Sequence, residues 1–262
     1  MTWFVLVGCA EKPNIRPQCA ENTNRTVRSQ NNKMQLLICG DPHGKFAHII
    51  EAVLEHRPSA TILLGDNTPD QPLDEALREI AGKTELFWIP GNHDTDTVEY
   101  HDRQFGSKLA DRNLHGRIID IAGLRVAGLG GVFRTKLWND TSKAAASPEG
   151  YIRSLKREER WRDGLPLRHR STIFRSQIDK LARHRADVLV THEAPDLHPY
   201  GSAAIAQLAN CMGVTRAFHG HHHVDKFYHG GVWQGVGLRG IVSLDGTTVR
   251  AGEFDAAMIV GD

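Results

Sequence analysis

"MQLLICGDPHGKFAHIIEAVLEHRPSATILLGD", residues 34–66, is the stretch that decides the fold class. The apolar run at 35–39 predicts a buried strand. Between Phe46 and Leu54 apolar residues recur at helical spacing, until Pro58 stops the helix. A second apolar run at 61–64 predicts the next strand. A strand, a helix and a strand in this order are typical of an α/β sheet.

The same alternation continues along the chain. A second helix is predicted from Pro72, with Leu73, Leu77 and Ile80 on one face, and a strand follows at 86–89. The remaining predictions are strands at 118–121, 124–129, 188–190 and 216–218, a helix at 205–212, and a final strand, turn and strand from Val232 onward with the turn at Asp245 and Gly246. The predicted fold class is therefore α/β.

Composition excludes several classes of protein. The chain has 262 residues, 40% of them hydrophobic, and a formal net charge of +1 at pH 7. That length suffices for one large core or two modest domains. The near-neutral charge lacks the overall basic excess by which nucleic-acid-binding domains are recognised. No apolar stretch approaches the ~20 residues that span a bilayer. The four cysteines are scattered without a C-x-x-C pair, which fits a reduced, cytoplasmic chain.

The first 33 residues differ in character from the rest. The apolar "MTWFVLVGC", residues 1–9, ends like a lipoprotein signal, but it is short and has no basic start. Residues 10–33 are polar and show no periodicity. We expect residues 1–33 to be a disordered or dispensable extension and residues 34–262 to be the functional domain. A lipid anchor on Cys9 is the alternative.

Five polar clusters follow predicted strands. They are "GDPHG" at 40–44, "GDN" at 65–67, "PGNHD" at 90–94, "THEAP" at 191–195 and "HGHHH" at 219–223. Each comes at the carboxyl end of its strand, which is the edge where open α/β sheets bind ligands. Five clusters built from Asp, Asn and His on one edge are hard to explain as turn chemistry alone. We therefore expect them to form one site.

The donors in these clusters predict a metal site. The oxygen donors are Asp41, Asp66 and Asn92, and the nitrogen donors are His43, His192, His221 and His223. Mixed oxygen and nitrogen sets suit manganese, iron or zinc. The donors are too many for one ion, so we expect two divalent metal ions that share a carboxylate. Such metal pairs are standard in phosphoryl displacement.

In the order Asp41-Pro-His43, Gly65-Asp66, Gly91-Asn92-His93-Asp94, His192 and Gly220-His221-His222-His223, the chain resembles the calcineurin-like metallophosphoesterase superfamily. The resemblance implies a four-layer α-β-β-α sandwich with two mixed β-sheets. It also implies two ligand sets that share Asp66 as a bridge. The first set is Asp41, His43, Asp66 and His223, and the second is Asp66, Asn92, His192 and His221.

The histidine cluster at 219–223 contains two kinds of residue. His221 and His223 would share one face of an extended segment and so point at the metals together, with His222 on the opposite face. By the same period His219 falls on the ligand side, although the family pattern does not use it.

A mechanism follows from the implied ligand roles. A hydroxide between the two ions would attack the phosphorus of a phosphomonoester or phosphodiester. Asn92 and His93 would bind the phosphoryl oxygens, and His93 is the candidate general acid for the leaving oxygen. Asp94 either orients the His93 imidazole or is a solvated loop carboxylate.

The second motif separates the chain from one branch of the superfamily. "GDPHG" is similar to the first motif of the Ser/Thr protein phosphatases, but 65–71 reads "GDNTPDQ" and lacks the Asp-Arg pair of that branch. The chain therefore resembles the general bacterial-type metallophosphoesterases, with a small phosphoester as the expected substrate. A nuclease of the same superfamily and a non-catalytic scaffold are the alternatives.

Residues 134–175 form a basic insertion with Trp138, Tyr151 and Trp161 interleaved among arginines and lysines. One interpretation is a lid or arm for an anionic substrate, including nucleic acid, because arginine and aromatic side chains together suit phosphates and bases. The other is a solvated helical insertion whose aromatic side chains pack on the core, or a contact between subunits.

Overall fold

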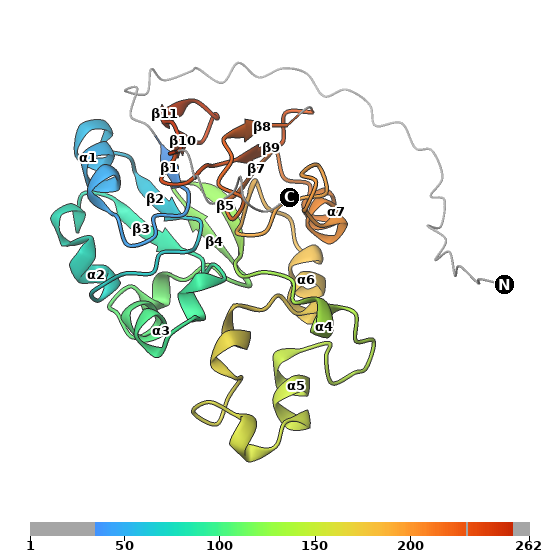
Figure 1. Cartoon of the computed structure of the whole chain (residues 1–262). Helices are drawn as coiled ribbons and strands as arrows, with labels where there is room; N and C mark the ends of the chain where they lie inside the picture. The colour runs from blue at the N-terminus through green and yellow to red at the C-terminus, as the bar shows by residue number, and fades with distance from the viewer. Residues whose placement is uncertain (1–34, 229, 254–262) are drawn as a thin grey trace, which may run out of the picture. The chain divides into compact units, whose positions relative to one another are not determined.

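The computed structural model describes residues 35–228 and 230–253 (Figure 1). The predictions made for residues 1–33, including the lipid anchor on Cys9, lie outside the described residues. No helix within the described ranges is both long and apolar enough to cross a membrane.

The first sheet has five strands in the order β11-β10-β1-β2-β3. Their bounds are β1 (Leu36–Cys39), β2 (Ala60–Leu63), β3 (Glu85–Trp88), β10 (Ile241–Ser243) and β11 (Thr248–Arg250). Strands β1, β2 and β3 are parallel, with Leu37 beside Thr61 and Thr61 beside Leu86. The last two strands are antiparallel to their neighbours, so the sheet is mixed.

The second sheet has six strands in the order β4-β5-β6-β7-β9-β8. Their bounds are β4 (Arg117–Ile121), β5 (Leu124–Leu129), β6 (Val188–Thr191), β7 (Arg216–His219), β8 (Lys226–Phe227) and β9 (Trp233–Gly235). Strands β5, β6, β7 and β9 run parallel, and β4 and β8 are antiparallel to their neighbours. This sheet is also mixed.

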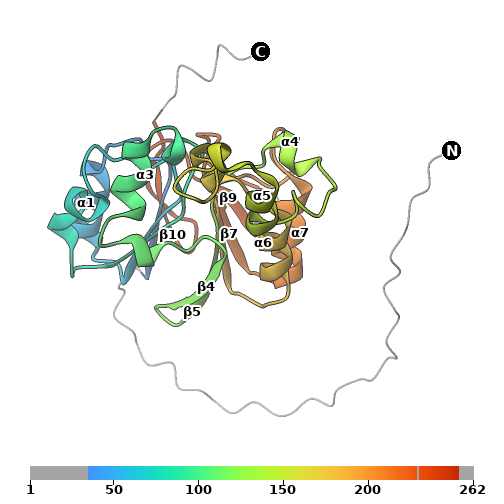
Figure 2. The same ribbon diagram turned by 90° about the horizontal axis from the view of Figure 1, so that it is seen from below.

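Three apolar clusters separate four layers. One cluster lies between the two sheets and contains Leu36, Ile62 and Val190. A second joins the first sheet to the helices α1 (Ala47–His56) and α2 (Leu73–Ala76), and a third joins the second sheet to α6 (Arg175–Ala182) and α7 (Ala203–Met212). Figure 2 shows α1 and α3 (Val98–Phe105) on one flank and α6 and α7 on the other, with the strands between them. The predicted α-β-β-α sandwich is confirmed.

Alternation along the strands explains why both faces of the first sheet are covered. In β1 the side chains of Leu36 and Ile38 enter the core between the sheets, whereas Leu37 and Cys39 pack under the helices. All four residues are completely buried. A continuous apolar run is therefore what this strand needs, because neither of its faces meets water.

The remaining helical elements are short. The helix predicted from Pro72 is split into α2 and a 3-10 turn, η1 (Arg78–Ile80), although Leu73, Leu77 and Ile80 are all buried as expected. Other 3-10 turns are η2 (His93–Thr95) and η3 (Ala110–Arg112). The insertion consists of α4 (Thr135–Trp138), α5 (Pro148–Ser154), η4 (Arg157–Glu159) and η5 (Leu167–Ser171) before α6 begins.

Candidate metal centre

The predicted ligands leave the strands of both sheets at their carboxyl ends. Asp41 follows β1, Asp66 follows β2 and Asn92 follows β3. In the second sheet His192 follows β6 directly, and the histidine cluster follows β7. Because the strands of each set are parallel, their carboxyl ends lie at one edge of the sheet.

The backbone of this site is unusual. Five of the predicted ligands have a positive φ: Asp41 (28°), His43 (43°), Asp66 (48°), His221 (70°) and His223 (52°). Residues with side chains adopt this conformation rarely, and it concentrates at functional sites where the surrounding structure enforces it.

This geometry corrects one prediction. Strand β7 ends at His219, and the left-handed conformations of His221 and His223 show that the segment after it is not extended. Both side chains still reach the site, because His223 contacts His43 and His221 lies beside His192. The bend at each residue, and not strand alternation, directs them there.

One group of donors converges around His192. The ligand atoms of Asp66, His192 and His221 all lie within 4.8 Å of one another. His192 Nε2 is 3.4 Å from Asp66 Oδ2 and 3.1 Å from Asn92 Oδ1. These four residues are the second of the two predicted ligand sets.

The other group converges around His43. Its Nε2 is 3.3 Å from His223 Nε2 and 3.9 Å from Asp66 Oδ2. Asp41 joins the site through Oδ1, which is 3.5 Å from His192 Nδ1, while Asp41 Oδ2 accepts the backbone N–H of His221 at 2.9 Å. Asp66 therefore lies between the two groups.

Metal ions fit these residues. His192 Nδ1 is 2.8 Å from the carbonyl oxygen of Leu64, which can only accept, so Nδ1 donates and Nε2 remains available as a ligand. Asp41 is completely buried and its Oδ1 has no hydrogen-bond partner. Burial raises the pKa of Asp41, so its negative charge needs a nearby cation. A divalent ion bound here would supply that charge.

Glycines leave the space that the carboxylates occupy. A Cβ on Gly220 would lie 2.8 Å from Asp41 Oδ1, and a Cβ on Gly91 would lie 2.2 Å from Asp66 Oδ1. Both distances are closer than real Cβ contacts allow. Each motif therefore places a glycine beside a carboxylate of another motif.

The charge of His192 depends on its two carboxylate neighbours. Burial opposes protonation, but Asp66 and Asp41 outweigh it and raise the pKa of His192 to about 10. In the chain without metal the imidazole therefore takes the place of a cation between the two acids. Metal binding would have to displace that proton, so metal affinity should increase with pH.

The carboxylate that contacts His93 differs from the predicted one. His93 Nδ1 is 2.6 Å from Asp96 Oδ2, and both side chains are about half exposed, at 51% and 50%. The prediction that Asp94 orients this imidazole, or is solvated, is wrong on both alternatives, because Asp94 is completely buried and bonded elsewhere. In the 3-10 turn η2, residues three apart stand above one another, which brings Asp96 over His93.

Asp94 instead ties two loops to helix α3. Its Oδ1 accepts the backbone N–H of Thr68 at 2.9 Å and Nε2 of Gln104 at 2.7 Å, and its Oδ2 accepts the N–H of Gly91 at 2.7 Å. Burial and the charge of Asp66 raise the pKa of Asp94 to about 6. Asp94 thus links the loops that carry Asp66 and Asn92 to helix α3.

The other two histidines of the cluster, His219 and His222, contact side chains outside the two predicted ligand sets. His222 stacks on His198 with ring centroids 3.9 Å apart, and its Nε2 is 3.6 Å from Glu193 Oε1. His219 is buried and its Nε2 pairs with the Tyr228 hydroxyl at 2.9 Å. The ligand atoms of Glu193, His221 and His222 also lie within 4.8 Å of one another.

Sequence reasoning missed Glu193 and Asp96. Glu193 stands inside the quoted "THEAP" motif directly after His192, and Asp96 stands three residues after His93. The spacing of three between His93 and Asp96 could have indicated their contact, because a short turn after the strand brings residues three apart together.

The basic insertion packs against the site loops. Ser171 Oγ in η5 bonds Thr95 Oγ1 in η2 at 2.7 Å. The three aromatic rings of the insertion contact other side chains. Trp138 contacts Phe133, and Trp161 contacts His101. Tyr151 contacts His169 and Phe174. Trp161 and Trp138 thus contact side chains outside the insertion, whereas both partners of Tyr151 belong to the insertion itself, so the packing of all three rings on the core stays a prediction.

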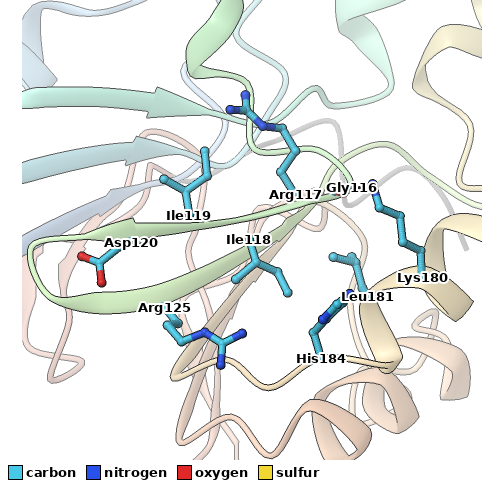
Figure 3. Close-up of a pocket in the computed structure, with 9 residues that line it drawn as sticks. All are labelled: Gly116, Arg117, Ile118, Ile119, Asp120, Arg125, Lys180, Leu181 and His184. Carbon is cyan, nitrogen blue, oxygen red and sulfur yellow. Dashed lines mark hydrogen bonds between the residues drawn. The ribbon is translucent and has the colours of Figure 1, made fainter.

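A cavity of about 630 Å³ lies apart from these residues, between the β4-β5 hairpin and helix α6 (Figure 3). Arg117 and Lys180 stand at its edge, but Arg117 donates to the carbonyls of Asp111 and Asn113, and Lys180 donates to that of Gly116. None of the predicted metal ligands lines it. The candidate site is therefore at the sheet edges and not in this cavity.

Known proteins are similar to this chain in sequence and in fold. An uncharacterized protein of Haemophilus influenzae Rd is 43% identical over 197 residues, which cover 74% of this chain and 85% of that protein. The crystal structure of TT1561 of Thermus thermophilus has the same fold, with a TM-score of 0.53 at 16% identity over 80% of this chain and 93% of that chain. The family model for calcineurin-like phosphoesterases matches residues 34–225, a range that contains all five motifs, and the chain therefore belongs to that family.

Proposed function

We propose that this chain hydrolyses a phosphomonoester or phosphodiester with two divalent metal ions. The observation that supports this best is the position of Asp66, whose Oδ2 lies 3.9 Å from His43 Nε2 and 3.4 Å from His192 Nε2. A carboxylate between two sets of donors is what a dinuclear site requires. The first ion would be held by Asp41, His43, Asp66 and His223, and the second by Asp66, Asn92, His192 and His221.

The metals proposed are manganese, with iron or zinc as alternatives, because the donors mix carboxylate, amide and imidazole groups. Two ions at this position supply Lewis acidity, which lowers the pKa of water and offsets negative charge on the phosphoryl oxygens.

The chain's own residues provide orientation and a proton. His93 is half exposed, and Asp96 holds its Nδ1, which leaves Nε2 to give a proton to the leaving oxygen. The backbone N–H of His93 donates to Asp66 Oδ1 at 2.8 Å, so the proton donor is fixed directly to the central carboxylate. Asn92 and His93 would together bind the phosphoryl oxygens.

Metal removal and reloading test this proposal. The full chain is treated with a chelator, reloaded with manganese, iron(II) or zinc, and assayed on nitrophenyl mono- and diesters, cyclic nucleotides, dinucleoside polyphosphates and single-stranded DNA. We expect activity to be lost and restored, with full activity at two ions per chain. Full activity without metal, or with one ion, would contradict the dinuclear proposal.

The same panel separates the alternatives. The insertion has a surplus of cations, so preferential cleavage of single-stranded DNA with a steep salt dependence would support the nuclease. Two bound ions without turnover on any phosphoester would support a non-catalytic scaffold. Such a scaffold is disfavoured because all seven predicted ligand residues are retained.

A further inference from the structure

Arg134 lies beside the two loops that carry His93 and His192. The chain leaves β5 and crosses these loops, where the backbone N–H of Gly131 donates to the carbonyl of Pro90 at 2.6 Å. The backbone N–H of Phe133 then donates to Glu193 Oε2 at 3.4 Å. Arg134 is the next residue, so its backbone lies near the exposed edge of the candidate metal centre that contains His93 and Asp96, which we call the rim.

The insertion fixes the guanidinium of Arg134. Its Nε donates to Thr172 Oγ1 at 3.2 Å, and its Nη2 donates to the carbonyl of Arg168 at 3.0 Å and to Ser171 Oγ at 3.3 Å. Ser171 Oγ also bonds Thr95, in the turn that carries His93. Two hydrogen bonds therefore connect the guanidinium to the turn of the proposed proton donor.

The charge of Arg134 is not neutralised by an ion pair. Among the described residues, no carboxylate oxygen lies within 4.0 Å of its guanidinium. Asp96 acts on it electrostatically, but that carboxylate is bonded to His93. Burial and the neighbouring Arg168 lower the pKa of Arg134, so the chain holds two cations close together at a cost.

Lys136 is a third cation of the same cluster, and its charge acts on His169 together with those of Arg134 and Arg168. Burial, together with the positive charges of Arg134, Arg168 and Lys136, lowers the pKa of His169 to about 4. His169 is therefore neutral at pH 7, and it bonds Thr172 through Nδ1 at 3.1 Å. Arg168 is joined to Arg134 through its carbonyl, and Lys136 lies two residues after Arg134 on α4. We call Arg134, Arg168 and Lys136 the rim cations.

The position of the rim cations indicates what they bind. Because His93 would protonate the leaving oxygen, groups that surround His93 face the leaving part of the substrate. A fixed guanidinium with further cations around it is suited to a phosphate group. Resting on the proposed function, we infer that Arg134, with Arg168 and Lys136, binds a second phosphate on the leaving group, so that the substrate is a small bisphosphorylated compound.

A polynucleotide fits this rim less well. Proteins that hold single strands usually combine cations with exposed aromatic rings on which bases stack. Here Trp138, Tyr151 and Trp161 are occupied in contacts within the domain. A compact anion is therefore the better match to the rim cations.

Two substrates that differ only in the second phosphate test the inference. The manganese-loaded full chain is assayed on the monophosphate and the bisphosphate of 1,3-propanediol. A primary alkoxide leaves from both, and only that of the bisphosphate carries a second phosphate. We expect the wild type to prefer the bisphosphate, and Arg134→Gln to reduce kcat/KM for the bisphosphate about 10- to 100-fold more than for the monophosphate, the range for one charge-assisted hydrogen bond. The exposed Arg153→Gln, on α5 of the same insertion, should change neither.

Lys136→Gln guards against a folding defect in Arg134→Gln, because Lys136 is exposed and has no hydrogen bond or ion pair among those described. It should show a smaller loss that is again selective for the bisphosphate, with an unchanged melting temperature. Equal losses on both substrates in both variants would overturn the inference while leaving the proposed hydrolase intact. Faster cleavage of single-stranded DNA than of the bisphosphate would overturn the small substrate.

A binding measurement separates the inference from the proposed function. Pentane-1,5-bisphosphonate replaces both ester oxygens by methylene groups and cannot be hydrolysed. Its Kd, measured by calorimetry on the manganese-loaded chain, should rise about 10-fold or more in Arg134→Gln and stay constant in Arg153→Gln. An unchanged Kd in Arg134→Gln would overturn the inference even if no ester is turned over. Absence of turnover with the expected change in Kd would overturn the proposed hydrolase alone.

Discussion

The floor and the rim of the candidate metal centre differ sharply in exposure. On the floor Asp41, Asp66 and His192 are 0%, 2% and 0% exposed, whereas on the rim the side chains of His93 and Asp96 are 51% and 50% exposed. Buried charges are costly unless they are compensated, which two metal ions on the floor would achieve. Exposed groups are free to touch a substrate. We therefore expect floor substitutions to affect metal binding and every substrate, and rim substitutions to affect catalysis selectively.

Asp66→Asn should have the largest effect, because Asp66 lies between both donor groups. A neutral amide would weaken both ions, so bound metal should fall toward one ion or none. Activity should drop by more than about 100-fold, since changes that only touch a ligand from outside already cost about 10- to 100-fold. Elemental analysis and the nitrophenyl ester assay measure the two effects. Full metal occupancy with normal activity would show that Asp66 does not bridge the two ions.

His93→Ala should come next and should behave as a rim residue. Both ions should stay bound, and hydrolysis of an alkyl phosphate should fall much more than that of a nitrophenyl ester, because the alkoxide needs a proton to leave. General acid catalysis typically contributes about 100- to 10,000-fold. Kinetics on the two esters, with metal content measured in parallel, check this. Loss of metal would show that His93 is a metal ligand. Equal losses on both esters would show that His93 stabilises charge on the phosphoryl group.

The fold was predictable wherever burial imposes a regular pattern. The strands at 36–39 and 60–63 and the helix at 47–56 followed from apolar runs and helical spacing. Strand β8 was missed because both of its residues are exposed and its two-residue length leaves no pattern to detect. The 3-10 turns of the insertion were missed because their form depends on contacts such as that between Ser171 and Thr95, which are distant in sequence.

The motifs indicated which side chains the structure brings together, but not the geometry with which they meet. Motif order placed the seven donors, but the left-handed backbone at His221 and His223 is set by the bonds and packing of the loops around them. For a similar reason Asp94 was predicted to contact His93, although Asp96 is the residue that does so. Two residues apart in one turn, the first points into the protein and the second toward solvent, and only packing decides which.

Asp94→Asn tests whether a buried residue that is not a predicted ligand still affects metal binding, as the floor residues are expected to do. Both oxygens of Asp94 accept N–H groups, so an amide NH2 would face the N–H of either Gly91 or Thr68 and leave it unpaired. The expected cost is about 1–3 kcal/mol of unfolding free energy. Metal affinity should also fall about 10- to 100-fold, because the loops of Asp66 and Asn92 would loosen.

Urea unfolding and metal titration measure these two losses. Asp70→Asn is the matched control, since it makes the same change on an exposed side chain of the neighbouring loop and should alter neither quantity. Unchanged stability and metal affinity in Asp94→Asn would show that the three hydrogen bonds do not hold the floor together.

Asp96→Asn should have the smallest effect. It tests whether the rim residue Asp96 acts only by positioning His93. Asn keeps an oxygen that can accept from His93 Nδ1 but loses the charge, and an exposed charged pair of this kind is worth about 0–1 kcal/mol. Hydrolysis of an alkyl phosphate should therefore slow by roughly 2- to 5-fold through kcat, with KM, metal content and nitrophenyl ester hydrolysis unchanged. Asp96→Ala should slow the alkyl ester further, because the ring loses its partner. In His93→Ala the Asp96→Asn change should add nothing, since a positioning residue has no effect once the group that it positions is gone. An additional loss in the double variant would mean that Asp96 contacts the substrate itself.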